Sequence, residues 1–548
     1  MAQNPKQSSA KPEQDTRLWR DPTPPPQRAL DEYDGRVLDP STAMALPGIT
    51  PYATVYVGPR LLISTLFDVP LLLGRLREVA AGLGWSVSLD AGVREPAEGR
   101  RRRGRMPRTW SKSGEDIGVV GVNLSVTEGN GKAVQAPDGW ILLQQARATF
   151  GNPMRGVGLD HIVFLRPGMW APNPGMWAPN PGMWGPNPID NAILSYMLPG
   201  SGGRQPVAYV GPRPHRHPDK RIKGRRPVVG VLDTGCGEHP WLEDAVQTDV
   251  RLNGKPIGYT LKKTNPEIHP DQVGPLDGGI DSYSGHGTFI CGLVHQMCPD
   301  ADIYAWRVVN SAGPVRESDL IKALRGILAL VEAYREDPRT GRPIDVLSLS
   351  LGYYHETPED ELIDPTVWEI MRRFGAAGTV VVCSAGNDAT ARPMFPAAFT
   401  PWDDGNGPIP PDPTALPVVS VGALNPSGKT DALFSNAGHW VRVHDYGAAV
   451  VSTLPLNFEG GALPASRTRA FKRVRESIDP DNFTGGFGVW SGTSFAAPLF
   501  AGRLAQEIGS RLMRNSNDTV AGAKRRAWAS LVELSDLRPQ ELRSAKRS

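Results

Sequence analysis

The chain has 548 residues, and its 60 lysine and arginine side chains against 57 aspartate and glutamate side chains leave a formal charge of +3. This length exceeds one ordinary domain, and the near balance of charge excludes an overall field that would attract nucleic acid or an anionic membrane. The first residues lack the apolar core of a secretory signal peptide, and no run approaches the ~18 apolar residues of a membrane helix. We therefore expect a cytoplasmic protein of two or three domains, with neither nucleic acid nor membrane as a partner.

Residues 1–48 are polar and rich in proline. Their apolar residues recur with neither the period of 2 of a strand nor the period of 3.6 of a helix. We expect a disordered arm.

Residues 49–167 alternate between strand-like and helix-like patterns. The order is strand, helix, strand, strand, helix, strand, and the six runs begin at Ala53, Val69, Trp85, Ile117, Asp138 and His161. This order is typical of a small α+β domain of the split βαβ kind. Between its second and third strands lies GRRRRGR, residues 99–105, which fits either a site for an acidic partner or a solvated loop.

Two linking segments follow. Residues 168–188 give the unit GMWAPNP almost unchanged three times, and residues 189–227 end in a basic stretch that we interpret as an exposed linker. Two prolines in each unit exclude a helix, and the Pro-Gly junctions favour type II turns. The evenly spaced methionines and tryptophans could bind a partner, cover the next domain or result from duplication. We favour a joint between two domains.

Residues 228–514 have a different pattern. Short apolar runs, typical of strands buried on both faces, begin at Val228, Ala301, Ile344, Thr379 and Pro417. Helical patterns separate several of them, and one such helix begins at Ser318, which we expect to cap it. The alternation predicts an α/β fold with a parallel sheet flanked by helices and functional residues at the carboxyl ends of the strands. Residues 515–548 predict one more helix and a charged tail.

Three short motifs place reactive side chains in this region. Asp233 ends an apolar strand, His286 stands between two glycines before an apolar helix, and Ser494 opens another. Alone, each has an ordinary explanation: a turn, a packed histidine or a helix cap. A serine becomes a good nucleophile only when a base takes its proton. The three residues therefore indicate catalysis only if they lie together in the fold.

With these motifs in place, residues 228–514 resemble the subtilisin-family (subtilase) serine peptidases. The matching motifs are DTG at Asp233, GHGT at Gly285, SLG at Ser350, SAGN at Ser384 and GTSFAAP at Gly492, which stand in the order of the family. Five motifs in that order make the resemblance specific. It implies a subtilisin-like fold and a serine endopeptidase that acts through an acyl-enzyme.

The resemblance also implies roles for single residues. Ser494 would attack the peptide carbonyl, His286 would accept its proton, and Asp233 would orient the imidazole, as in subtilisin itself. Asn387 and the Ser494 backbone amide would form the oxyanion hole.

Substrate recognition follows from the same family pattern. Ser350, Leu351 and Gly352 would pair with the substrate backbone as an added strand, and Ser384, Ala385 and Gly386 would form the facing wall of the first specificity pocket. The resemblance implies a protein or peptide substrate and no required cofactor, and we expect a monomer. Many family members bind structural calcium, and no motif here identifies such a site.

This sequence departs from compact family members in two places. The stretch between Asp233 and His286 is long, and a second insertion spans about 454–487. Such loops near the cleft would narrow the substrate range. The four cysteines form no CxxC pair, so we expect buried thiols rather than disulfides or a metal site.

The N-terminal domain has two interpretations. Many subtilases carry a βαββαβ propeptide that blocks the cleft until it is cut away, and residues 213–227 would be a natural place to cut. The alternative is a permanent accessory domain. For the whole chain, the complete set of catalytic residues favours a peptidase over a catalytically silent binding protein with the subtilase fold.

Overall fold

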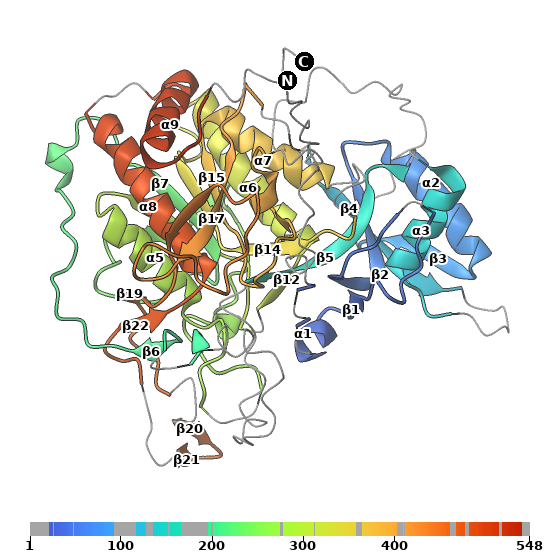
Figure 1. Ribbon diagram of the computed structural model, residues 1–548, viewed down its shortest axis with the longest axis horizontal. Coiled ribbons are helices and arrows are strands. Elements are labelled where there is room, and N and C mark those ends of the chain that lie inside the picture. The colour runs from blue at the N-terminus through green and yellow to red at the C-terminus, as the bar shows by residue number, and fades with distance from the viewer. Residues whose placement is uncertain are drawn as a thin grey trace, which may run out of the picture.

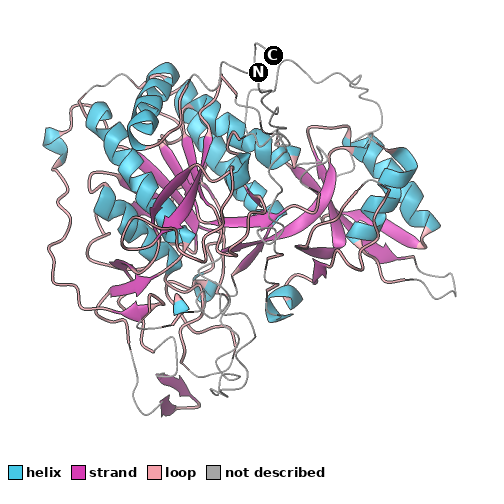
Figure 2. Cartoon of the chain, viewed as in Figure 1, coloured by secondary structure: helices cyan, strands magenta, loops and turns pink. Residues whose placement is uncertain are grey.

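The structure is a computed structural model, and it describes residues 21–539 except 23, 26, 48, 92–116, 128–134, 152–153, 166–194, 199–200, 275–277, 312, 358–363, 403–408, 410–411, 461–466, 477–481 and 515–517. The predictions for GRRRRGR and for the GMWAPNP repeat therefore lie outside the described residues. Figures 1 and 2 show a large lobe and a smaller lobe joined by strands.

A seven-stranded parallel sheet forms the centre of the large lobe, as the alternating pattern predicts. Its strands in spatial order are β18 (Val443–Tyr446), β17 (Val418–Leu424), β15 (Val380–Ser384), β13 (Val346–Leu349), β7 (Val228–Asp233), β11 (Asp302–Arg307) and β8 (Val246–Gln247). Parallel strands run to the same edge of a sheet, so the carboxyl ends of β7, β13 and β15 lie side by side.

Helices cover both faces of this sheet (Figure 2). One face packs on α6 (Glu317–Glu336) and α7 (Pro365–Ala377), and the other on α5 (His286–Met297), α8 (Thr493–Leu512) and α9 (Val520–Leu534). Successive residues of β7 alternate between the two cores, with Leu232 in the first and Val231 in the second. Burial on both faces explains why these strands read as continuous apolar runs.

The small lobe has the predicted order of elements. These are β2 (Thr54–Ser64), α2 (Val69–Gly82), β3 (Trp85–Leu89), β4 (Val119–Val126), α3 (Gly139–Phe150) and β5 (Val157–Leu165). Its own core lies between the helices and one face of the sheet, and includes Leu61, Leu76 and Leu143. The fold is therefore the expected α/β domain preceded by a small α+β domain.

One strand, β5, joins the two lobes. It pairs with β2 inside the small lobe and, at its carboxyl end, antiparallel with β12 (Pro314–Arg316) and β14 (Leu351–Tyr354) of the large lobe. Figure 1 shows this strand in teal, running from the small lobe into the large one. One eight-stranded sheet, which also contains β1 (Gly35–Leu38), β3, β4 and β16 (Met394–Phe395), thus crosses the domain boundary.

Part of the N-terminal arm is ordered, which corrects the expectation for residues 1–48. Residues Gln27–Asp31 form helix α1, and Gly35–Leu38 form strand β1, which pairs antiparallel with β2. An added edge strand takes its register from the partner backbone, so a short strand needs no apolar period of its own.

The expected cap of α6 is also different. The helix begins at Glu317, and Ser318 is not its N-cap. Instead, Asp160 of β5 accepts hydrogen bonds from the Ser318 amide at 3.0 Å and from its hydroxyl at 2.8 Å. A carboxylate from the small lobe therefore accepts a hydrogen bond from a backbone N–H group that has no partner within the helix, at the start of α6 in the large lobe.

The basic stretch before β7 lies along the large lobe. Arg225 makes ion pairs with Asp345 and Asp518, and Arg226 with Asp300. The short elements not yet named are β6 (Gln205–Pro206), β9 (Arg251–Leu252), β10 (Lys255–Pro256), β19 (Val450–Thr453), β20 (Arg467–Ala470), β21 (Arg473–Glu476), β22 (Phe487–Trp490), η5 (Asp219–Arg221), η6 (Lys262–Thr264) and η7 (Ala397–Phe399). None of the helices in the described part of the chain has the length and apolar character needed to span a bilayer. All four cysteines are free thiols, as expected.

Candidate active site

The three candidate catalytic residues come from elements that meet at one edge of the sheet. Asp233 is the last residue of β7, His286 the first of α5, and Ser494 the second of α8. The start of α5 approaches the β7 loop so closely that a side-chain carbon on Gly287 would lie 2.0 Å from the Gly235 carbonyl oxygen. The glycine after His286 is thus required by this close approach of the two backbones.

Asp233 and His286 form a buried pair. The distance from His286 Nδ1 to Asp233 Oδ1 is 2.8 Å, and the two residues are 0% and 1% exposed. The same oxygen accepts a 2.8 Å hydrogen bond from the Thr234 amide, which holds the carboxylate in place. Because Nδ1 donates to the carboxylate, the lone pair of the neutral ring lies on Nε2.

The second ring nitrogen of His286 makes no hydrogen bond to any residue that the structure describes. Within the described residues, His286 Nε2 is buried without a hydrogen bond. The rings of Trp490 and Phe495 lie against the imidazole, with centroids 5.6 and 5.2 Å away. The imidazole is therefore fixed by one hydrogen bond and by aromatic packing, and Nε2 remains open to a donor.

Ser494 lies at the same edge. Its hydroxyl is directed to the Ser350 carbonyl oxygen at 3.5 Å rather than to His286 Nε2, and the Ser350 hydroxyl donates to the Ser494 carbonyl at 3.0 Å. The hydrogen bond between nucleophile and base is commonly long or absent without substrate.

Asn387 follows β15 and is held by the residue before the nucleophile. Its Oδ1 accepts hydrogen bonds from the Thr493 amide at 2.8 Å and the Thr493 hydroxyl at 2.7 Å. This fixes which end of the amide is NH₂, and a side-chain carbon on Gly492 would lie 3.4 Å from Asn387 Nδ2. The donor end of Asn387 thus faces the chain that leads into Ser494.

The predicted wall residues Ser384, Ala385 and Gly386 connect β15 to Asn387. Gly386 has a positive φ of 99°, and its amide donates to the Thr493 hydroxyl at 3.1 Å. Only glycine adopts this backbone without strain, so the segment turns where the family pattern has a glycine.

Glu267 is a neighbour of the site that the sequence reasoning missed. It is 1% exposed and accepts hydrogen bonds from the hydroxyls of Thr234 and Thr288, both at 2.5 Å, and from the Gly287 amide at 3.2 Å. Burial raises the pKa of its carboxyl group. The residue lies in the long stretch between Asp233 and His286, so this insertion supports the two segments that carry these candidate catalytic residues.

We expect Glu267→Ala to lower the free energy of unfolding by about 2–4 kcal/mol, because the buried Thr288 hydroxyl loses its acceptor and the Thr234 hydroxyl keeps only Asp233 Oδ1, at 3.1 Å. Urea denaturation followed by circular dichroism measures the change. Glu243→Ala, at an exposed position, is the matched control and should stay within about 0.5 kcal/mol of the unchanged protein. Equal stability of the two variants would contradict the bracing role.

The strand predicted to bind substrate already has a partner. Leu351 lies opposite Leu165 and Gly352 opposite Phe164, so β5 occupies the edge of β14. On its other side β5 pairs with β12, where Val163 lies opposite Val315. The end of β5 therefore lies between two strands of the large lobe, as an added peptide strand would.

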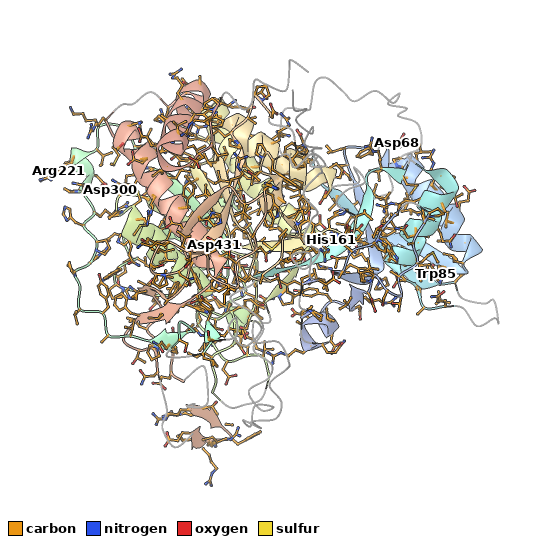
Figure 3. All side chains as sticks on the ribbon, viewed as in Figure 1. Asp68, Trp85, His161, Arg221, Asp300 and Asp431 are labelled. Carbon is orange, nitrogen blue, oxygen red and sulfur yellow. The ribbon has the colours of Figure 1, made fainter. Side chains whose placement is uncertain are left out.

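A buried ionic cluster secures this contact. His161 of β5 is 2% exposed, and its Nδ1 lies 2.5 Å from Glu317 Oε2 and its Nε2 2.8 Å from Glu356 Oε2. A carboxylate only accepts, so both ring nitrogens must be protonated to satisfy both contacts. Figure 3 shows His161 at the junction of the two lobes. The two ring nitrogens are thereby used, which leaves this imidazole no lone pair for a metal.

The surroundings of His161 determine its charge. Burial would lower the pKa of His161, but Glu317 and Glu356 outweigh burial and raise it to about 10. Burial would also raise the pKa of Glu356, yet His355 and His161 hold it well below its ordinary value. Burial lowers the pKa of His355 to about 4. A histidine cation between two carboxylates is the state that this geometry favours.

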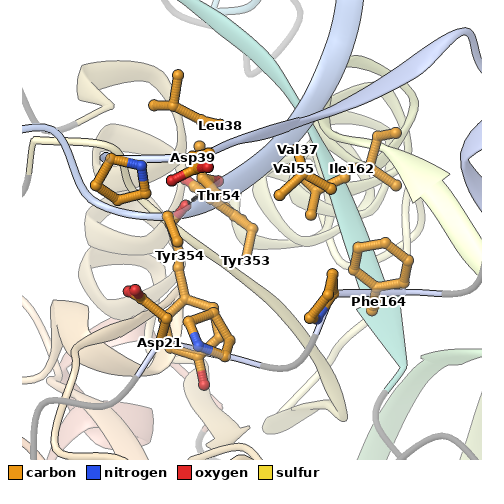
Figure 4. Close-up of a pocket in the computed structure, with 14 residues that line it drawn as sticks. Asp21, Val37, Leu38, Asp39, Thr54, Val55, Ile162, Phe164, Tyr353 and Tyr354 are labelled. Atoms are coloured by element: carbon orange, nitrogen blue, oxygen red, sulfur yellow. Dashed lines mark hydrogen bonds between the residues drawn. The ribbon is translucent and has the colours of Figure 1, made fainter. Parts of the chain in front are cut away.

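A cavity of about 270 Å³ lies on the opposite face of β5. Figure 4 shows Ile162 and Phe164 of β5 lining it together with Thr54, whose hydroxyl donates to the Tyr354 carbonyl at 2.5 Å. Residues of both lobes line this cavity, and none of the candidate catalytic residues is among them. It is a space between the lobes and not the substrate cleft.

Comparison with known proteins places these motifs in a family. Residues 224–521 match the model of the subtilase family. An intracellular serine protease of Paenibacillus polymyxa is 26% identical over 52% of this chain and 67% of its own length. The major intracellular serine protease of Bacillus subtilis is 25% identical over 52% of this chain and 69% of its own length.

A search of solved structures adds fervidolysin from Fervidobacterium pennivorans, described as a keratinolytic enzyme related to subtilisin. It has 18% sequence identity and a TM-score of 0.41, and the match covers 88% of this chain and 62% of that chain. The family model spans more than half of the 548 residues, and all five motifs lie inside its match. The chain therefore belongs to the subtilase family of serine peptidases.

Proposed function

We propose that this protein is a serine endopeptidase that uses Ser494, His286 and Asp233, and that its own N-terminal domain blocks the substrate cleft. The buried 2.8 Å hydrogen bond between Asp233 and His286, with His286 Nε2 left open, carries the first part of the proposal. The pairing of β5 with β14 carries the second.

In the proposed reaction, Ser494 Oγ attacks the carbonyl carbon of the scissile bond while its proton passes to His286 Nε2. Asp233 stabilises the imidazolium that forms, and His286 then returns the proton to the leaving amine. Asn387 Nδ2 and the Ser494 amide at the start of α8 donate to the oxyanion. Water attacks the acyl-enzyme in the second half, with the same proton path.

A serine-directed fluorophosphonate probe tests this assignment. We expect mass spectrometry to find the label on Ser494 in the full-length protein, and on no residue in Ser494→Ala. Asp233→Asn should label much more slowly, because the imidazole loses the acceptor that fixes its tautomer. Absence of label under every condition tried, including variants that open the cleft, would favour the silent binding protein.

The blocking role rests on which face of β5 meets the large lobe. Val163 and Leu165 are buried in the core of the large lobe, whereas Ile162 and Phe164 pack with Val55 and other residues of the N-terminal region. Alternate side chains of the strand thus pack against the large lobe, and the side chains between them pack within the N-terminal region. A substrate that pairs with β14 must first displace β5.

Docking of the N-terminal domain should depend on pH through His161. Its ordinary pKa is 6.5 and its pKa in the docked state is raised to about 10, so docking is strongest below the lower value and weakens as pH rises towards the higher one. The groups that face or influence the imidazole are Glu317, Glu356, Tyr353, His355, Arg147 and Asp364. Between these two pKa values, docking takes up as much as one proton.

We therefore expect the activity of the full-length protein to rise by up to about tenfold for each pH unit between about pH 7 and 9. Each activity is divided by that of Val163→Asp at the same pH. In this variant the buried charge should release β5, so the ratio removes the titration of the proposed catalytic residues. His161→Arg keeps its charge through this range and should abolish the slope. A slope of equal steepness in His161→Arg would assign the pH dependence to another group.

The site of action is part of the proposal. Two of the relatives are named intracellular serine proteases, which supports a cytoplasmic peptidase that acts on protein or peptide substrates. A peptidase in that compartment needs a device that keeps it inactive, and the docked β5 would supply one.

A further inference from the structure

The docked β5 shows how an extended peptide fits the large lobe. The strand pairs antiparallel with β12 over residues 162–164 and with β14 over residues 164–165, where Phe164 lies opposite Gly352. Since alternate side chains of a strand share a face, His161, Val163 and Leu165 point to the same side. The contacts of these three side chains therefore describe three positions that a substrate would occupy.

The first of these positions is acidic. Glu317 and Glu356 contact the His161 ring from the two sides, and they are 2% and 0% exposed. Both glutamates belong to the large lobe, one at the start of α6 after β12 and the other two residues after β14. The two glutamates remain with the peptidase when β5 leaves, whereas the nearby Arg147 leaves with the N-terminal domain.

One acceptor at this position is not used by histidine. Within the described residues, Glu356 Oε1 is buried and has no hydrogen-bond partner. Leaving a buried carboxylate oxygen unpaired is costly, and an imidazolium has only two N–H groups, both of which are taken. An arginine has five N–H donors and a lysine three, so either could also reach the unused oxygen.

We propose that Glu317 and Glu356 form a substrate subsite that selects a cationic side chain, three residues before the substrate residue that pairs with Gly352. The inference deepens the proposed function and rests on it. Once β5 is displaced, two buried carboxylates face the position that a substrate side chain enters. An uncharged side chain there leaves Glu356 with only His355, whose Nδ1 lies 3.6 Å from Glu356 Oε2, and Glu317 with only the carboxyl group of Asp364. An acidic side chain adds repulsion.

The first arm of the test keeps the full-length chain and varies residue 161. His161→Arg and His161→Lys should label as slowly as the unchanged protein, because each keeps a cation between the glutamates. His161→Gln should label with a fluorophosphonate about 10-fold to 100-fold faster than the unchanged protein at pH 7. Equal labelling rates for the Gln and Arg variants would overturn the inference.

The second arm uses the His161→Gln chain as the enzyme. The substrates are internally quenched peptides that copy residues 159–165 and continue with mixed residues, so that no cleavage position is assumed. The position of His161 carries arginine, lysine, norleucine or glutamate. We expect kcat/KM for the arginine and lysine peptides to exceed that for norleucine by about 10-fold to 100-fold, and the glutamate peptide to be the poorest.

Replacing both glutamates, as Glu317→Gln with Glu356→Gln, should bring the ratio of arginine to norleucine within about threefold of unity. Glu243→Gln, at an exposed position, is the matched control and should leave that ratio high. Peptide cleavage without any preference for the cation would overturn the subsite and leave the peptidase standing. Failure of every variant to cleave peptide or to accept the probe would instead reject the proposed function.

Discussion

Replacing His286 with alanine is expected to lower kcat for peptide hydrolysis by about 10⁶-fold, the order found when the histidine of subtilisin itself is removed. Without the imidazole, no described group near Ser494 can accept its proton, because the hydroxyl then faces only the Ser350 carbonyl. KM should change little, since substrate binding depends on the β14 edge. Steady-state hydrolysis of a quenched peptide measures both constants, in chains that also carry Val163→Asp to release β5.

The double variant His286→Ala with Ser494→Ala sharpens this prediction. Residues that act as a unit are not additive, so the double variant should lose no more activity than either single variant. A multiplicative loss would show that the two residues act independently and would contradict the triad. The residual rate should reflect the oxyanion hole and substrate binding alone.

Replacing Val163 with aspartate is expected to raise the activity of the full-length protein by about 100-fold to 4,000-fold, because an unpaired charge buried in the docked state costs about 3–5 kcal/mol. Val163 is 0% exposed and lies opposite Val315 in the core of the large lobe. It does not belong to the core of the N-terminal domain, so that domain should stay folded after release. Hydrolysis of a quenched peptide at fixed pH measures the gain.

Val126→Asp is the matched control for this variant. Val126 ends β4, lies opposite Trp85 of β3 and is 45% exposed, so the same substitution should leave the activity unchanged. Adding Ser494→Ala to Val163→Asp should remove the gained activity, which excludes a contaminating peptidase. An unchanged activity in Val163→Asp would mean that β5 does not block the cleft.

The sequence was sufficient to place the candidate triad because its chemistry depends on short motifs at strand and helix ends. Asp233 and His286 stand far apart in the chain, yet a strand end and a glycine-flanked helix start are each visible locally. The fold could be predicted for the same reason, since strands buried on both faces have continuous apolar runs in the sequence. In both cases the deciding signal lies within a few neighbouring residues.

What the sequence could not predict depends on contacts between distant segments. Ser318 has the residue type of a cap, but the carboxylate of Asp160 in the other lobe supplies that function. Glu267 gave no signal, because a lone glutamate in a loop is ordinary until two threonine hydroxyls converge on it. The pairing of β5 with β14 likewise follows from tertiary docking and from no local pattern.

Hydrogen–deuterium exchange of the β14 segment is the most direct test of the account, because it reports whether β5 occupies the substrate edge. In the unchanged full-length protein, the amides of Leu351 and Gly352, which lie opposite β5, should exchange slowly, and in Val163→Asp their exchange should be faster by a factor similar to the gain in activity. The buried strand 380–384 should be equally protected in both proteins. Equal exchange of Leu351 and Gly352 in the two proteins would contradict the claim that this peptidase holds its own strand in the cleft.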